Sequence, residues 1–465
     1  MTLLAAHLND AGLLLTDGER ILAREPGFAL LEDDQLVMGR AAWAVASLKP
    51  RRIQNRYWAH LTTDSLPDRR FEHLTAADLV SKQLESLWRN AAQPGDKLVL
   101  AVPPYMNADN LGLLLGIAMD LEIPVVGMVD AAVAATRREY ANAVPVHVDL
   151  SLHSAMLTRL SQQGQVQLER AAVIDDAGML NLYDAWLRII AETFVQQSRF
   201  DPLHTAETEQ ALRDSILDWL AQATTRESVT MQVEYRGITH AAEIESIELV
   251  SAAASVYQNI VSNLRALYRA GELPALQLSN RAARMPGLAE TLRARVGGEV
   301  FVLEPGATGR GLARRSPERG SGGAVTLVRH LAWDQSRIEV EVDEDRGGAL
   351  PTHVLLGDRA LPIGADALVF GTQPADGERW CDLGRDVAGA SRRHCEIAVS
   401  DGQCVVTDRS RYGTFLNGHR IDGSAALQSG DVIRVGTPGV EPVSYTHLTL
   451  PTSCVQCRSR WSPYH

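Results

Sequence analysis

Two short polar motifs near the end of the chain carry side chains that can bind an anion. Residues 391–394 read Ser-Arg-Arg-His and residues 413–418 read Gly-Thr-Phe-Leu-Asn-Gly, with Arg411 and Tyr412 directly before the second motif. A phosphate dianion needs charge-assisted hydrogen-bond donors in fixed positions, and hydroxyl and guanidinium groups are such donors. Loops on a rigid scaffold can supply them without moving the scaffold. The chemistry to expect here is therefore recognition of an anion.

The sequence around these motifs predicts short strands joined by turns. Residues 395–399 and 404–407 are rich in β-forming side chains, and Asp401-Gly402 between them is a two-residue hairpin signal. Residues 430–436 read as a further turn and strand. We expect a small all-β module that carries the polar motifs on its loops.

The order of these features resembles the forkhead-associated (FHA) family over roughly residues 352–440. Four separated features arrive in the family's order: a glycine after an apolar strand (Gly371), then SxxH, then GTxxNG, then a glycine-aspartate turn before an apolar strand. The resemblance implies a β-sandwich that binds phosphothreonine peptides through loops at one end. The implied partner is a phosphothreonine-containing protein.

The resemblance also implies roles for individual residues. Ser391 would donate its hydroxyl to the phosphate, and Arg392 would lie beside it. Arg411 and Tyr412 fall on the second loop, where the family contacts the phosphate and the residues that follow the phosphothreonine. Four more residues are expected to shape the loops instead of binding the ligand: Gly371, His394, Gly413 and Asn417.

One position departs from the family. The family usually places an arginine directly after the first glycine, where a guanidinium binds phosphate with two hydrogen bonds, and here that position is Thr372. Arg385, Arg392 or Arg411 could compensate for the loss. The alternative is an FHA fold that serves as a packing module and binds no phosphate.

The composition fits a globular chain of several domains. Its 465 residues suggest about three units of roughly 150 residues each. The formal net charge of −12 argues against a general nucleic-acid binder and against a binder of anionic membranes. The richest apolar stretch, residues 111–129, contains Asp120, Glu122 and Pro124, so it predicts no membrane span. Five cysteines without a framework spacing, and no basic leader at the start, indicate a reducing cytoplasm.

The first three hundred residues predict alternating strands and helices. Continuous apolar runs at residues 98–102 and 125–129 are typical of buried parallel strands, and a helical pattern at about 109–121 separates them. Thr75, followed three residues later by Asp78, predicts a capped helix start. Further strands are expected at residues 146–150 and 229–235, with a hairpin formed by residues 156–160 and 166–172, and further helices are expected at residues 180–198 and 206–223.

This order of elements resembles the actin-like ATPase fold, specifically the nucleotide-binding domain of DnaK-type chaperones, over residues 1–315. Four stretches carry the resemblance, at the places of the two phosphate loops, a central segment and the adenosine segment: residues 9–12, 100–135, 148–151 and 276–296. The resemblance implies a two-lobed α/β domain of ribonuclease H-like repeats, for which ATP with Mg²⁺ is the possible cofactor. The implied nucleotide-contacting residues are Asp10, Gly12, Asp130 and Asp149.

The motifs of this domain are eroded. Ser151, Leu152 and His153 replace the glycines of the second phosphate loop. Glycine is needed there because it lets backbone N–H groups approach the anion. In the adenosine segment, Leu278 and Ser279 or residues close to them replace the paired glycines. Two readings stay open: a scaffold that binds nucleotide weakly or not at all, and an ATPase that turns over slowly. No catalytic residue and no metal site is assigned.

The remaining segments set the expected boundaries. Residues 1–313 form the degenerate actin-like domain, residues 314–324 a flexible linker rich in Gly, Arg and Ser, and residues 325–442 the FHA sandwich with a preceding β-segment. Residues 443–465 resemble translated adapter read-through at the ends of unrelated reading frames. We expect this tail to be non-native and disordered.

The patterns together predict an α/β two-lobed actin-like domain followed by an all-β FHA sandwich, in a bacterial cytoplasmic protein. The expected function is that of a phosphothreonine-binding adaptor or scaffold whose DnaK-like part lacks efficient ATP hydrolysis. One alternative is an active ATPase that its FHA domain recruits to phosphorylated partners. Another is a structural component of an assembly in which neither site binds its ancestral ligand.

Overall fold

The computed structural model describes most of the chain, in two compact units, Met1–Val342 and Asp343–His465. The described residues are 2–32, 35–269, 271–315, 325–340, 351, 353–356, 359–373, 378–383, 389–400, 402–417, 419–427, 431–436, 439–440 and 443–445. Within these ranges no helix is both long enough and apolar enough to cross a membrane.

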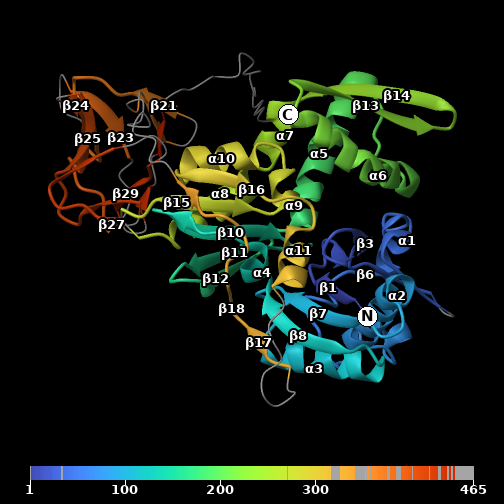
Figure 1. Cartoon of the computed structure of the whole chain (residues 1–465). Coiled ribbons are helices and arrows are strands. Elements are labelled where there is room, and N and C mark those ends of the chain that lie inside the picture. Colours follow the sequence, from blue (N-terminus) through green and yellow to red (C-terminus); the bar gives the residue numbers. More distant parts are fainter. Residues whose placement is uncertain are drawn as a thin grey trace. The chain divides into compact units, whose positions relative to one another are not determined.

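Two six-stranded sheets form the centre of the first unit (Figure 1). The first sheet has the spatial order β17 (Leu327–Val328), β8 (Val125–Asp130), β7 (Lys97–Val102), β1 (Leu3–His7), β2 (Leu13–Thr16), β3 (Ile21–Glu25). The second has the order β16 (Glu299–Val302), β15 (Pro274–Leu278), β10 (Val144–Leu150), β11 (Ser154–Ser161), β12 (Val166–Asp175), β18 (His330–Leu331).

The two sheets repeat one arrangement. In the first, β1, β2 and β3 form an antiparallel meander, β7 pairs parallel with β1, and β8 pairs parallel with β7. In the second, β10, β11 and β12 form the meander, and β15 and β16 follow parallel to β10. Parallel neighbours require crossover connections, which helices supply. The expectation of a mixed α/β unit with buried parallel strands is confirmed.

The other elements of the first unit are helices and small sheets. The helices are α1 (Arg40–Trp43), α2 (Ala76–Ala91), α3 (Ala108–Asp120), α4 (Ala131–Ala135), α5 (Met179–Ser198), α6 (Ala206–Ala223), α7 (Ser246–Ala252), α8 (Ala254–Arg265), α9 (Asn280–Ala283), α10 (Leu288–Arg295) and α11 (Ala307–Arg314), with 3-10 turns at Pro50–Arg52 and Arg69–Phe71. The small sheets are β5 (Leu36–Met38) with β4 (Ala29–Leu31) and β6 (Ile53–Gln54), the hairpin β13 (Ser228–Tyr235) with β14 (Ile238–Glu245), and β9 (Tyr140–Ala141) with β19 (Ile338–Glu339).

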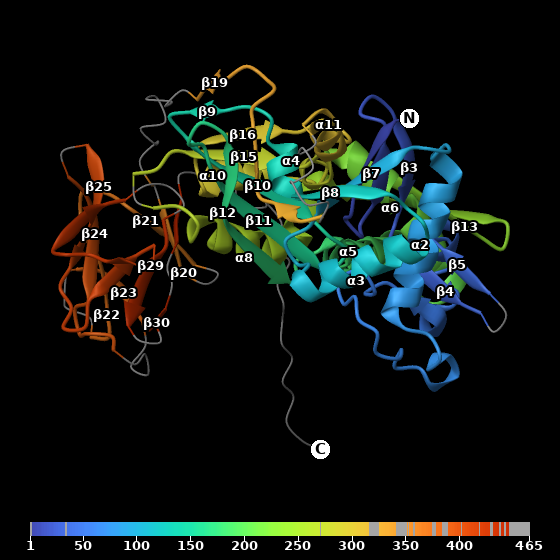
Figure 2. The same ribbon diagram turned by 60° about the horizontal axis from the view of Figure 1, so that its bottom comes forward.

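Helix α2 begins where the sequence predicted. The Thr75 hydroxyl accepts the backbone N–H of Asp78 at 3.2 Å, and the Asp78 carboxylate accepts the N–H of Thr75 at 2.8 Å, which completes a capping box. Its apolar face, with Leu79 and Val80 fully buried, packs into the core beneath the first sheet. Helices α2 and α3 lie side by side in both views (Figures 1 and 2).

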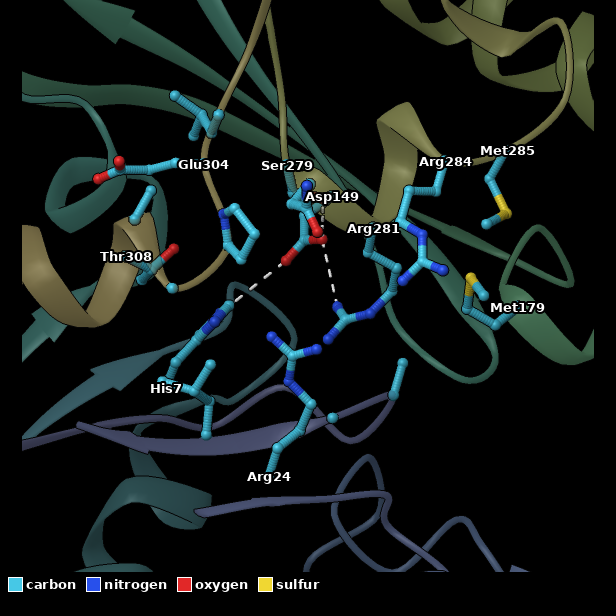
Figure 3. Close-up of a pocket in the computed structure, with 18 of the residues that line it drawn as sticks. His7, Arg24, Asp149, Met179, Ser279, Arg281, Arg284, Met285, Glu304 and Thr308 are labelled. Carbon is cyan, nitrogen blue, oxygen red and sulfur yellow. Dashed lines mark hydrogen bonds and ion pairs between the residues drawn. The ribbon is translucent and has the colours of Figure 1, made fainter. Parts of the chain in front are cut away.

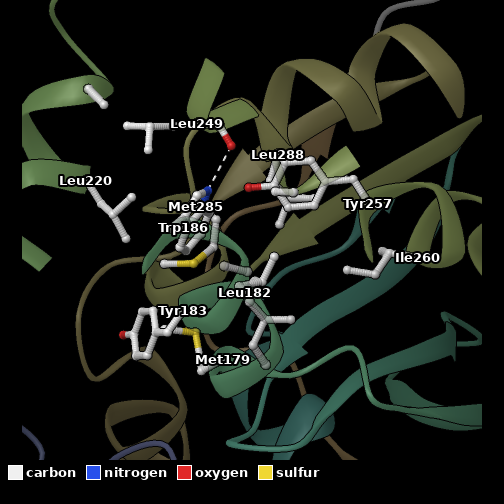
Figure 4. Close-up of a cluster of buried hydrophobic side chains, with 14 of the residues drawn as sticks. Met179, Leu182, Tyr183, Trp186, Leu220, Leu249, Tyr257, Ile260, Met285 and Leu288 are labelled. Atoms are coloured by element: carbon white, nitrogen blue, oxygen red, sulfur yellow. Dashed lines mark hydrogen bonds between the residues drawn. The ribbon is translucent and has the colours of Figure 1, made fainter. Parts of the chain in front are cut away.

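A second core fills the space between the second sheet and helices α5, α6, α8 and α10. Trp186 and Tyr257 are at its centre (Figure 4). The Trp186 indole donates to the carbonyl of Leu249 at 2.8 Å, and the Tyr257 hydroxyl donates to the carbonyl of Pro286 at 2.8 Å. Both large side chains are thereby buried with their polar atoms satisfied.

Residues 325–340 add strands to the first unit. β17 pairs with β8, β18 with β12, and β19 with β9. The boundary that the sequence suggested at residue 325 is therefore corrected, because this segment extends the sheets of the first unit and does not precede the β-module as part of it. Two-residue strands carry no signal of which sheet they join.

A buried ion-pair cluster holds this segment in place. Asp334 pairs with Arg137 at 2.5 Å and with Arg315 at 3.5 Å, and the two guanidinium side chains are only 7% and 5% exposed. Arg315 also donates to the backbone carbonyls of Ala134 and Thr136. Arg315 is therefore fixed in the first unit, although the sequence assigned it to a flexible linker. The rest of that linker, residues 316–324, lies outside the described residues.

The second unit is built from strands throughout its described part. Its sheets have the orders β23 (Arg379–Asp382), β22 (Leu368–Gly371), β24 (Cys395–Ser400), β25 (Gln403–Asp408), β28 (Ser424–Ala426); β27 (His419–Arg420), β26 (Thr414–Leu416), β29 (Ile433–Gly436), β30 (Gly439–Val440); and β21 (Arg359–Pro362), β20 (His353–Leu356), β31 (Val443–Tyr445). Phe370, Ile397 and Val406 are among the fully buried core residues. The predicted hairpin is β24 paired with β25.

The start of the expected disordered tail is also corrected. Val443–Tyr445 form β31, which pairs antiparallel with β20. Residues 446–465 lie outside the described residues, so the prediction for them stays a prediction.

Candidate functional site

The first polar motif lies on the loop before β24, pressed against the end of β22. A Cβ atom on Gly371 would stand 2.0 Å from the carbonyl oxygen of Arg392, so only glycine allows this approach. The backbone N–H of Thr372, the residue found in place of the family's arginine, donates to the carbonyls of Ser391 and Arg392 at 3.2 and 3.1 Å. The Thr372 backbone therefore fixes the loop.

His394 connects the two polar loops. Its Nδ1 accepts the backbone N–H of Ser391 at 3.0 Å, and its Nε2 donates to the carbonyl of Gly413 at 3.2 Å. These two bonds require the neutral imidazole with its proton on Nε2. The side chain is fully buried, and this burial lowers the pKa of His394, although the bond to Gly413 opposes the shift.

Asp408 shapes the second loop. Its Oδ1 accepts the N–H of Ser410 at 2.9 Å and the hydroxyl of Thr414 at 2.8 Å. The Ser410 hydroxyl in turn accepts the N–H of Gly413, which has a left-handed φ of 93°. Burial would raise the pKa of Asp408, but the hydrogen bonds from Ser410 and Thr414 keep it below its ordinary value.

Ser391 lies where the loops meet. Its Oγ accepts the backbone N–H of Arg411 at 3.1 Å. Within the described part of the chain, no acceptor takes the hydroxyl hydrogen of Ser391, so that hydrogen remains available to a ligand. Asn417, also in the left-handed region, instead bonds inside the module, with its Oδ1 accepting the N–H of Val432 at 2.9 Å.

The arginines around these loops divide into two groups. Arg393 pairs with Glu378 and Glu396, and Arg409 pairs with Glu396 at 2.7 Å, so their charges are neutralised. Arg392 and Arg411 are exposed and contact no carboxylate among the described residues. The Arg411 guanidinium lies 5.9 Å from the ring centre of Tyr412, which is 57% exposed. Arg385 lies outside the described residues.

Comparison with known families decides what this module is. The FHA domain family model matches residues 369–436. The chain carries an FHA domain. FHA domains bind phosphothreonine-containing proteins, and the matched segment contains both polar loops. No curated protein matches the chain. The resemblance of residues 1–313 to actin-like ATPases stays a prediction.

The FHA domain has one further cation that the sequence reading missed. The side chain of Arg420, on β27, crosses Gly413, so that a Cβ on that glycine would stand 2.5 Å from the arginine Nε. Arg420 is exposed and has no carboxylate partner in the described part of the domain. The signal was available, because the sequence Asn417-Gly418 favours a two-residue hairpin, which predicts the observed pairing of Arg420 with Phe415.

In the first unit, Asp149 is enclosed by donors from the protein itself (Figure 3). Its Oδ1 accepts from the Ser279 hydroxyl at 2.5 Å and from Arg281 Nη1 at 3.3 Å, and its Oδ2 accepts from Asn9 Nδ2 at 2.8 Å. Burial opposes ionisation of Asp149, but the charge of Arg281 outweighs it with the help of its other partners and keeps the pKa below the ordinary value.

The other three residues that were predicted to contact a nucleotide have different surroundings in the structure. Gly12 lines the same cavity as Asp149, and a Cβ on it would stand 3.0 Å from Arg281 Nη2. Asp10 is fully buried and accepts the N–H of Leu152 at 2.8 Å, and burial raises its pKa to about 6. Asp130 caps helix α4 through the N–H of Ala132 at 2.9 Å, and burial raises its pKa to about 6 as well.

The second phosphate-loop segment is likewise occupied. Leu152 is buried in an apolar cluster with Phe28 and Leu30. The carbonyls of Ser151 and Leu152 accept the N–H groups of Met179 and Leu180, so these donors at the start of α5 are already bonded. In the described residues there is also no cluster of three His, Cys, Asp or Glu side chains that could hold a metal. At this loop the buried Leu152 side chain and the bonded N–H groups of Met179 and Leu180 stand where a phosphate loop has open glycine backbone.

Proposed function

We propose that the protein is a phosphothreonine-binding adaptor or scaffold of the bacterial cytoplasm. In this proposal the FHA domain binds the phosphorylated partner through Ser391, Arg392, Arg411 and Tyr412. The first unit is a degenerate actin-like, DnaK-related domain that does not hydrolyse ATP efficiently.

The observation that carries the proposal is the position of the Ser391 hydroxyl. The N–H of Arg411 occupies one of its lone pairs, and its hydrogen is available to a ligand. The His394 imidazole holds the two loops together, so the donors are placed before a ligand arrives. Such preorganised, charge-assisted donors are what a phosphate dianion requires.

Three guanidinium groups can replace the one lost at Thr372. Arg392, Arg411 and Arg420 adjoin the two loops and have no carboxylate partner among the described residues. An arginine without an internal counter-ion loses little when it turns to a phosphate, whereas Arg393 and Arg409 would have to leave Glu396. This distribution of charge favours phosphate binding over a purely structural FHA module.

Two observations support the proposal for the first unit. The repeated order of the two six-stranded sheets is the kind of internal duplication that an actin-like fold of two ribonuclease H-like lobes requires. The guanidinium of Arg281 and the side chain of Leu152 occupy space that the glycines of a phosphate loop would leave open. An active ATPase, the rival function, would need that space for the triphosphate.

A pair of neighbouring arginines provides the sharpest test. We expect the full chain to bind fluorescent phosphothreonine peptides from a library, and Arg392→Gln to weaken binding by roughly tenfold or more, the value of one charge-assisted hydrogen bond. Arg393→Gln is the matched control, since that side chain is already paired with Glu378 and Glu396. Fluorescence anisotropy measures both.

Two results would contradict the proposal. Preference for phosphoserine, phosphotyrosine or unphosphorylated peptides would exclude phosphothreonine recognition. Titration of the full chain with ATP by calorimetry tests the first unit separately, and micromolar affinity that depends on Mg²⁺ would establish the rival ATPase.

A further inference from the structure

A cavity in the first unit collects three arginines from separate elements. Arg24 comes from β3, Arg281 from α9, and Arg284 follows α9, and their guanidinium groups converge near Asp149 and Met179 (Figure 3). The cavity has a volume of about 210 Å³. We call it the arginine cavity.

The arginine cavity has more positive than negative charge. Arg281 is paired with Asp149 at 3.3 Å, and Glu304, the other carboxylate in the lining, is paired with Arg310 at 2.7 Å. Arg24 and Arg284 then have no carboxylate partner in the part of the chain that the structure describes. The pKa of Arg24 is lowered by partial burial and then by the like charges of Arg281 and Arg284.

Like charges held together without counter-ions are unfavourable, and an anion between them removes the repulsion. Arg24 and Arg284 are both exposed to solvent, so a ligand can reach them. Guanidinium groups bind carboxylate and phosphate oxygens directly, through N–H donors in a fixed planar arrangement.

The rest of the lining indicates what else the ligand carries. Apolar and aromatic side chains also contribute to the cavity, among them Met179, Tyr183, Leu217, Leu220 and Met285. Methionine packs adaptably against flat or irregular apolar groups. A volume of about 210 Å³ is below the roughly 300–1,000 Å³ typical of drug-sized ligand sites, so the body of the ligand must be small.

We infer that the arginine cavity binds a small organic oxyanion, a carboxylate or phosphate group on a compact apolar body, through Arg24 and Arg284 and without a metal. The site is not the phosphopeptide site of the FHA domain, and it takes a smaller ligand than ATP. The inference does not depend on the proposed function, because no residue is shared between the two sites.

Calorimetry with defined probes tests the inference. Phenyl phosphate, benzoate and inorganic phosphate are titrated into the full chain in low salt with EDTA. We expect phenyl phosphate or benzoate to bind more tightly than inorganic phosphate, and Arg24→Gln or Arg284→Gln to weaken that binding by roughly tenfold or more. The exposed Arg89→Gln on α2 is the matched control and should leave it unchanged.

The FHA domain also binds phosphate in the proposed function, so its contribution is removed with Ser391→Ala. Binding that survives Ser391→Ala and is lost in Arg24→Gln places the ligand in the arginine cavity. Three results would each overturn the inference: no binding of any probe at millimolar concentration, binding by Arg24→Gln and by Arg284→Gln that is as tight as binding by the unaltered chain, or equal affinity for inorganic phosphate and phenyl phosphate.

If either arginine variant unfolds, hydrogen–deuterium exchange of the unaltered chain tests whether the probe binds in the arginine cavity. Phenyl phosphate or benzoate should then protect the backbone around residues 22–25 and 280–285. The absence of protection at both segments would equally overturn the inference.

Discussion

The hydroxyl oxygen of Ser391 and the backbone N–H of Arg411 are 3.1 Å apart, and this hydrogen bond joins two loops whose residues are 20 positions apart in the chain. Ser391 belongs to the first loop, and its oxygen is held by an N–H group of the second loop. This bond fixes the direction of the Ser391 hydroxyl. The second connection, through His394, keeps the loops together even when the hydroxyl is absent. A substitution of Ser391 can therefore test ligand binding without separating the two loops.

Ser391→Ala should weaken phosphothreonine-peptide binding and leave the FHA domain folded. The change removes one hydrogen bond to a charged ligand, which is worth about 1.5–3 kcal/mol, or roughly ten- to a hundredfold in Kd. Fluorescence anisotropy of the full chain measures the loss. The exposed Ser400→Ala on β24 is the control. Equal affinity of the two variants would show that Ser391 does not touch the ligand.

Arg420→Gln should also weaken binding, since this guanidinium lies over Gly413 at the second loop. We expect roughly a tenfold loss at low ionic strength and a smaller loss at high salt, because exposed charges are screened. Arg409→Gln is the control, as its charge is already neutralised by Glu396. A loss for Arg409→Gln that matches or exceeds the loss for Arg420→Gln would remove Arg420 from the site.

The connection between the loops should weaken in acid. Burial lowers the pKa of His394, so the folded domain favours the neutral imidazole and the unfolded chain binds more protons. The stability that follows is present above about pH 6.5, the ordinary pKa of histidine, and is lost as the pH falls through the lowered value. Hydrogen–deuterium exchange of residues 391–413, corrected for intrinsic rates, should rise over that interval.

A non-titrating side chain provides the comparison. His394→Asn removes the protonation step, so its exchange should be faster at neutral pH and nearly independent of pH below 6.5. Exchange in the unaltered chain that stays constant from pH 7 to pH 5 would contradict the assigned role of His394.

Local patterns in the sequence predicted the elements and several of the loop residues. Residues 98–102 form a buried parallel strand, because burial on both faces requires continuous apolar sequence. The capping box of α2 involves only the four consecutive residues 75–78, so it too could be found in the sequence. The FHA motifs were equally local. Arg420 could have been found by following the register of the Asn-Gly hairpin one step further.

Contacts between distant segments could not be predicted in this way. Arg281 meets Asp149 across 132 residues because β15 lies beside β10 in the second sheet. Neither segment has a sequence pattern that specifies the other strand as its neighbour in the sheet. The same limit explains the misplaced boundary at residue 325, since the partner of a two-residue strand is decided by the sheet edge that it reaches.

The Asp334 cluster tests that boundary directly. Asp334→Ala leaves Arg137 and Arg315 buried without their carboxylate, and breaking a buried pair from one side costs about 3–5 kcal/mol. We expect the segment of residues 325–340 to detach before the rest of the first unit unfolds, because mainly the short strands β17, β18 and β19 and the hydrogen bonds from Arg138 to Gln335 would still hold it. Limited proteolysis, with cleavage sites mapped by mass spectrometry, measures the detachment.

Asp334→Asn separates charge from geometry. The amide oxygen can still accept from Arg137, so the cleavage rate within residues 325–340 should lie between those of the unaltered chain and Asp334→Ala. Phosphothreonine-peptide binding should not change in either variant, because the cluster belongs to the first unit. If Asp334→Ala weakened peptide binding while residues 325–340 stayed protected, the segment would belong functionally with the FHA domain, as the sequence first suggested.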